Sequence, residues 1–84
     1  MTTEWQRSVL DPVEGLIGRW EERGETEAVA ALLPAWRANS GLTDGWQDVL
    51  AAMRAVSQRV TLPDDEAETL ASAADRIASA LRNR

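Results

Sequence analysis

The sequence contains no cysteine, histidine, lysine, tyrosine or phenylalanine. Without cysteine and histidine it lacks the usual protein ligands of zinc, copper and haem, and it can form no disulfide. The same absences exclude Ser-His-Asp and Cys-His catalysis, as well as Schiff-base chemistry on a lysine. We therefore predict that the chain is not an enzyme and holds no metal or cofactor.

Long hydrophobic runs are also missing. The longest apolar stretch, residues 28–36, contains Pro34 and is far shorter than the roughly 20 residues that a membrane span needs. The first residues carry Glu4 and lack the apolar segment of a secretion signal. These features predict a cytoplasmic location and no membrane partner.

Positive charge is scarce, with 9 basic against 14 acidic residues and a formal net charge of −5. A duplex nucleic-acid binder needs a basic stripe that displaces counterions from phosphates, so we predict no nucleic-acid partner. The negative charge is compatible with a basic protein partner.

The apolar residues recur every three or four positions almost throughout, and β-branched residues are few. This pattern predicts an all-α chain of 84 residues in one domain, a compact bundle of four to five short helices. The predicted helices span about 4–10, 12–23, 26–39, 44–60 and 63–82, and the third is expected to be kinked at Pro34. Gly24 is expected to end the second helix in the left-handed conformation.

Pro12 allows two interpretations. The segment Asp11-Pro12-Val13-Glu14 is typical of a helix start, with a capping aspartate and an early proline. The rival interpretation is one kinked helix, because the apolar positions continue through the proline. We favour the break. The pair Gly15 and Gly18 is too short for a phosphate-binding loop, and we expect it to serve close helix packing.

An internal repeat links the second and third predicted helices. The pattern Val13-x-x-Leu16-Ile17-x-x-Trp20 recurs sixteen residues later as Val29-x-x-Leu32-Leu33-x-x-Trp36. Two similar apolar faces joined by a tight turn predict an αα-hairpin. Duplication and chance similarity of amphipathic helices explain the repeat equally well.

Tryptophan is the only aromatic residue and occurs four times. A buried tryptophan contributes a large apolar area, and tryptophan and arginine are also enriched at protein interfaces. Trp36, Arg37 and Trp5 are therefore our interface candidates. The candidates for an apolar core or pocket are Trp20, Trp46, Leu50, Met53, Leu70 and Ile77.

Carboxylates are the remaining reactive groups. Asp44 and Asp48 share a helical face, and Asp64, Asp65, Glu66 and Glu68 crowd the start of the last predicted helix. Paired carboxylates can hold Mg²⁺ when they are buried and converge. At a helix start, acidic residues far more often stabilise the helix end, and we predict that role here.

The segment Leu62-Pro63-Asp64-Asp65-Glu66-Ala67-Glu68, followed by Leu70 and Ile77, resembles part of the acyl carrier proteins. The resemblance covers roughly residues 41–82 and implies an acidic helical bundle. It aligns Gly41-Leu42-Thr43-Asp44-Gly45 with the family's Gly-x-Asp-Ser-Leu motif. Asp44 then stands where the family has the serine that carries phosphopantetheine, and Ser40 lies before the helix. The resemblance thus implies a carrier-like fold without carrier activity.

Together these features predict a non-catalytic helical module that binds another protein, as an accessory subunit or as an immunity- or antitoxin-type protein. Because so small a core stabilises a fold only marginally, a homodimer is a further expectation. The alternatives are a helical bundle that binds a small apolar ligand and the carrier-like fold.

Overall fold

The computed structural model describes residues 4–39 and 43–82, and it confirms an all-α bundle. The described residues form four helices, α1 (Glu4–Arg23), α2 (Thr26–Ala38), α3 (Thr43–Arg59) and α4 (Asp64–Arg82), and no strand. This count lies within the predicted four to five.

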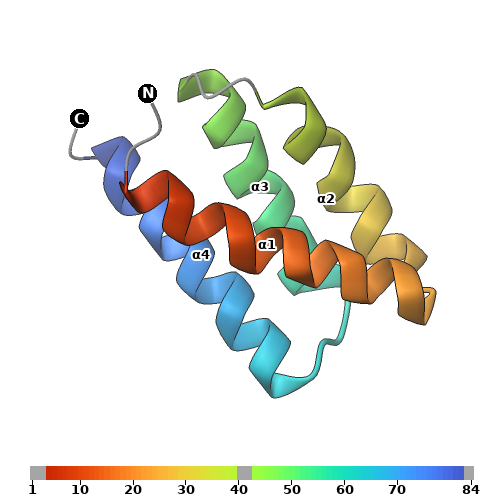
Figure 1. Cartoon of the computed structure of the whole chain (residues 1–84). Coiled ribbons are helices and arrows are strands. Elements are labelled where there is room, and N and C mark those ends of the chain that lie inside the picture. The colour runs from red at the N-terminus through yellow and green to blue at the C-terminus, as the bar shows by residue number, and fades with distance from the viewer. Residues whose placement is uncertain (1–3, 40–42, 83–84) are drawn as a thin grey trace.

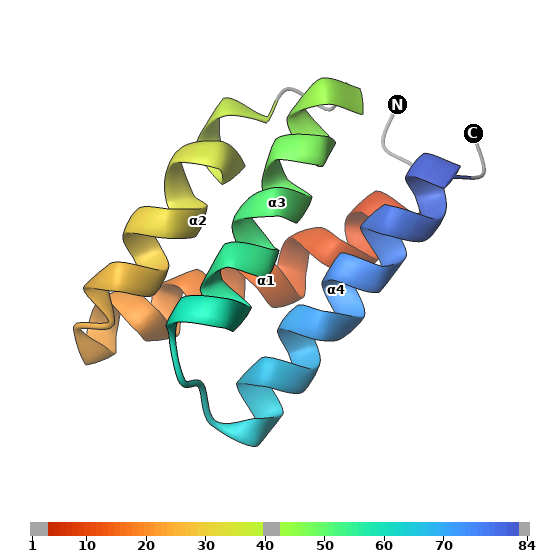
Figure 2. The ribbon, with the colours of Figure 1, turned by 180° about the vertical axis from the view of Figure 1, so that it is seen from behind.

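Three of the helices form a layer, and the fourth crosses it. In Figures 1 and 2, α3 lies between α2 and α4, while α1 runs across one face of these three helices. The helix α1 packs against α2 and α4, and α3 packs against the same two helices. Because α2 stands at an edge of the layer, one of its sides faces none of the other described helices.

The core fills the space between the layer and α1. The structure places all six core or pocket candidates there, Trp20, Trp46, Leu50, Met53, Leu70 and Ile77, together with Val9, Val13, Leu16, Ile17, Ala28, Leu32, Val49, Val56 and Ala73. Burial of such side chains is the main favourable term in folding. Glu66 is the one charged residue among the buried described side chains.

The predicted break at Pro12 is wrong, because α1 is one helix of 20 residues. Its buried residues continue on both sides of the proline, as Val9 before it and Val13 after it, while Pro12 itself is exposed. A proline cannot donate the N–H that the carbonyl four residues earlier normally accepts. Here that carbonyl belongs to Ser8, and Nη1 of Arg76 on α4 donates to it at 3.3 Å. Packing against the core and this donor hold the helix together where the local sequence favours a stop.

The turn between α1 and α2 follows the prediction for Gly24, which has a φ of 76°. Its N–H donates to the carbonyl of Glu21, and the N–H of Glu25 donates to the carbonyl of Trp20 at 2.8 Å. This pair of bonds is the Schellman motif, which satisfies the last carbonyls of a helix. The next helix, α2, continues without interruption through Pro34, which is exposed.

The packing role expected for Gly15 and Gly18 is wrong. A methyl group at either position would meet no atom within 4 Å, so neither glycine brings α1 close to another helix. None of the helices among the described residues is long and apolar enough to span a bilayer.

Candidate functional site

The side of α2 that points away from the bundle is the candidate site. Glu27, Ala30, Pro34 and Arg37 are exposed and follow one another at spacings of three, four and three, which places them on one line along the helix. Val29, Leu33 and Trp36 are half-buried beside this line. We call these seven residues the α2 outer face.

The helix α2 buries fewer residues than its apolar composition would lead one to expect. It is the most apolar of the four helices, yet the structure buries only Ala28 and Leu32 in it. By contrast, α1 buries Val9, Val13, Leu16, Ile17 and Trp20. The bundle therefore leaves Val29, Leu33 and Trp36 of its most apolar helix at the edge of the core, packed against it but partly exposed.

The internal repeat makes the same contrast position by position. In the first copy, Val13, Leu16, Ile17 and Trp20 are all buried. In the second copy only Leu32 is buried, and Val29, Leu33 and Trp36 remain half-buried. The same pattern thus serves the core in α1 and reaches the surface in α2.

Two tryptophans join α2 to α3. The rings of Trp36 and Trp46 meet edge to face, with centroids 6.1 Å apart and an interplanar angle of 83°. This is a favourable aromatic geometry. Because Trp46 is only 3 % exposed, it gives the half-buried Trp36 a fixed support. Arg37 follows on the exposed side, and no ion pair to it occurs among the described residues.

A polar cluster lies where the end of α1 meets the first turn of α4, and in it Trp20 and Glu66 are buried while Arg23 is exposed. Oε1 of Glu66 accepts hydrogen bonds from Nε1 of Trp20 at 3.0 Å and from Nη2 of Arg23 at 2.8 Å. Oε2 of the same carboxylate accepts Nη1 of Arg23, also at 2.8 Å. The guanidinium therefore binds the carboxylate through two parallel bonds, which is the strongest common geometry for this pair.

The hydrogen bonds of this cluster shift the pKa values of both Glu66 and Arg23. The hydrogen bonds from Arg23 hold the pKa of Glu66 below its usual value, and the bond from Trp20 acts in the same direction, while burial opposes them. The bond to Glu66 likewise raises the pKa of Arg23. Glu66 is thus a charged carboxylate at 4 % exposure, and its oxygens are occupied by donors of the chain itself.

The sequence interpretation missed this residue, because it treated Glu66 as one of several acidic residues at a helix start. A signal was present, since Glu66, Leu70, Ala73 and Ile77 recur at helical spacing and form the buried stripe of α4. Trp20 in α1 supplied a second signal, because a buried indole N–H needs a hydrogen-bond acceptor.

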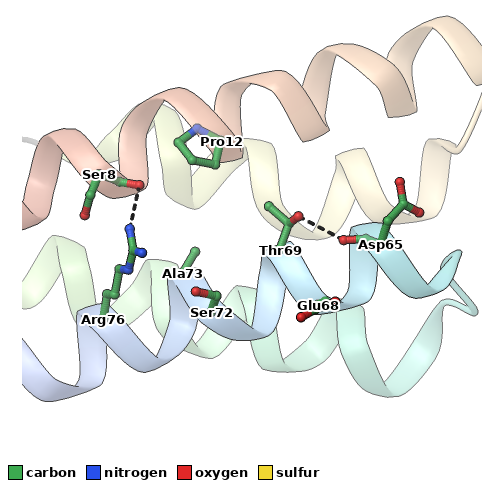
Figure 3. Close-up of a pocket in the computed structure, with 8 residues that line it drawn as sticks. All are labelled: Ser8, Pro12, Asp65, Glu68, Thr69, Ser72, Ala73 and Arg76. Carbon is green, nitrogen blue, oxygen red and sulfur yellow. Dashed lines mark hydrogen bonds between the residues drawn. The ribbon is translucent and has the colours of Figure 1, made fainter.

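A groove of about 400 Å³ runs between α1 and α4 on the outside of the bundle (Figure 3). Arg76 and the carbonyl of Ser8 meet at one end, and Asp65 and Glu68 stand towards the other. The hydroxyl of Thr69 donates to the carbonyl of Asp65 at 2.9 Å. The groove is open and its lining is about equally polar and apolar, and Arg76 lies about two turns of α4 away from Glu68.

Several predicted site residues lie elsewhere. Trp5 belongs to α1, but its side chain is outside the described part of the structure, as are the side chains of Thr43 and Asp44 and the whole of Ser40, Gly41 and Leu42. Met53 reaches a shallow groove between α3 and α4. Among the described residues, Trp20, Trp36 and Trp46 do not line the groove between α1 and α4 or the groove between α3 and α4.

Among the described residues, no three carboxylates come close enough to hold a metal ion together. The fold and the outer face define a small acidic four-helix bundle with one partly exposed apolar helix. Comparisons with protein-family models, curated proteins and solved structures find no match to the chain. The resemblance of residues 41–82 to acyl carrier proteins therefore stays a prediction.

Proposed function

We propose that this protein is a non-catalytic interaction module that binds another protein through the α2 outer face. The observation that carries the proposal is the partial exposure of the most apolar helix, in which Val29, Leu33 and Trp36 pack against the core but remain half-buried. Exposed apolar patches with a polar rim are typical of protein interaction sites. Glu27 and Arg37 supply such a rim at the two ends of α2.

Trp36 and Arg37 are the expected anchors. Tryptophan and arginine dominate the energetics of many interfaces, particularly where a rigid ring fills a pocket of the partner. The contact with Trp46 restricts the ring of Trp36 before binding, so less conformational entropy is lost when a partner binds.

The net charge of −5 favours a basic partner, because opposite charges accelerate association. An accessory subunit of a larger complex and a protein that neutralises a basic enzyme or toxin would both use such a surface. In either role the chain acts by occupying a surface and carries out no reaction.

A photo-crosslinking experiment in the cells that make the protein tests the proposal. A photoreactive residue at position 37 is expected to capture a defined protein, and Trp36→Ala in the same chain is expected to reduce the yield. A photoreactive residue at position 54 is the control, because Arg54 is exposed on α3 in a groove shared with α4. Equal capture from both positions, or no loss with Trp36→Ala, would contradict the proposal.

A further inference from the structure

The α2 outer face is complementary to itself when two copies run in opposite directions. Glu27 lies in the first turn of α2 and Arg37 in the last turn, and both side chains are exposed. Neither forms an ion pair with another described residue. The midpoint of these two positions is residue 32, which is also the midpoint of the exposed pair Ala30 and Pro34.

A two-fold axis perpendicular to α2 near this midpoint therefore brings unlike residues together. Glu27 of each copy lies opposite Arg37 of the other, which makes two ion pairs with one geometry. Ala30 lies opposite Pro34 of the other copy, and these small side chains let the two helices approach closely. Such a surface that pairs with itself is what a two-fold dimer requires.

The half-buried residues follow the same symmetry. A two-fold axis in this orientation places the same flank of both helices on one side of the contact. Leu33 then lies beside Leu33 of the other copy at the edge of the contact, whereas Val29 and Trp36 lie further round each helix, towards the bundle. The contact would thus cover the half-buried Leu33 together with the exposed Ala30 and Pro34.

From this complementarity we infer that the occupant of the α2 outer face is a second copy of this chain, paired antiparallel through α2 with Glu27 opposite Arg37. The inference rests on the proposed function but replaces its basic partner with a second copy. This is possible because the α2 outer face carries one acidic and one basic residue and so has no net charge, although the whole chain is acidic. Thirteen residues of helix span about 20 Å at a rise of about 1.5 Å per residue. The contact is therefore short, and the dimer dissociates on dilution.

Charge reversal tests the pairing. Sedimentation equilibrium over a roughly hundredfold concentration range is expected to give a mass that rises from 9.2 kDa towards twice that value. Glu27→Arg or Arg37→Glu alone places like charges opposite each other twice, and each is expected to weaken the dimer by about tenfold. The double variant E27R/R37E recreates both ion pairs with the signs exchanged, so it is expected to restore the dimer.

The controls carry the same charge changes at exposed positions away from the face. Glu14→Arg on α1 and Arg54→Glu on α3 are expected to leave the dissociation constant unchanged. Circular dichroism melting of every variant separates a loss of pairing from a loss of folding.

Each result has a defined meaning. A monomeric wild-type chain at all concentrations overturns the inference, and so does a dimer that neither single reversal weakens. Failure of the double variant to recover, while it remains folded, overturns the antiparallel arrangement. If the wild-type chain is monomeric but position 37 captures a different protein, the proposed function stands and only the identity of the partner is wrong.

Discussion

The indole N–H of Trp20 donates to the carboxylate of Glu66 across 46 positions of sequence, at a distance of 3.0 Å between Nε1 and Oε1. This bond joins the last turns of α1 to the first turn of α4, and Arg23 completes the cluster from the surface. A charged residue thereby closes one end of an otherwise apolar core.

Removal of this carboxylate is expected to lower the free energy of unfolding. Glu66→Ala leaves the buried indole of Trp20 without its acceptor and releases Arg23, so we expect a loss of about 3 kcal/mol in the free energy of unfolding. Glu66→Gln keeps an acceptor oxygen and is expected to lose less. Urea unfolding followed by circular dichroism measures both values. Glu68→Ala, at an exposed position two residues later, is the control and should change stability by less than about 0.5 kcal/mol.

The same carboxylate makes stability depend on pH. Because the pKa of Glu66 is lower in the folded chain than in the unfolded chain, its contribution is complete above the usual glutamate pKa of about 4.3. It is lost as the pH falls through the lower folded value. The difference in stability between the wild-type chain and Glu66→Gln is therefore expected to shrink as the pH falls below that range. A difference that is constant between neutral and acidic pH would contradict this assignment.

Pro12 and Arg76 are expected to be energetically coupled. Pro12→Ala supplies an N–H for the carbonyl of Ser8 and should stabilise the chain by about 1–3 kcal/mol, because a proline inside a helix costs about that much. Arg76→Ala should then lower the free energy of unfolding by less in the Pro12→Ala background than in the wild-type chain. A double-mutant cycle of unfolding free energies measures the coupling. Additive effects of the two substitutions would mean that the bond from Arg76 contributes nothing.

The two glycines within α1 and the glycine that ends this helix are expected to respond in opposite ways to substitution by alanine. Gly15→Ala and Gly18→Ala meet no neighbouring atom, so each should stabilise the helix by about 0.5–1 kcal/mol. Gly24→Ala forces a side chain into a φ of 76° and should destabilise the chain by about 1 kcal/mol. Thermal unfolding compares the three variants. Destabilisation by Gly15→Ala would show that this position has a neighbour after all.

The sequence predicted the helices well wherever the local signals for a helix start or end agree with the tertiary packing. The apolar periodicity indicated helices close to those observed, and Gly24 ended α1 as expected. The same reasoning failed at Pro12, where the local signal for a helix start is strong. There the buried side chains on both sides of the proline, with Arg76 from α4, outweigh the missing hydrogen bond.

The sequence by itself determined the helical class, the net negative charge and the lack of cysteine, histidine and lysine side chains, because these follow from composition and from spacing along one segment. Only the tertiary structure decided which face of each helix is buried. The two copies of the Val-x-x-Leu-Leu/Ile-x-x-Trp pattern carry the same local information, yet all four residues of the first copy are buried and only Leu32 is fully buried in the second. Burial depends on how many neighbouring helices surround a segment, and contacts between distant parts of the chain set that number.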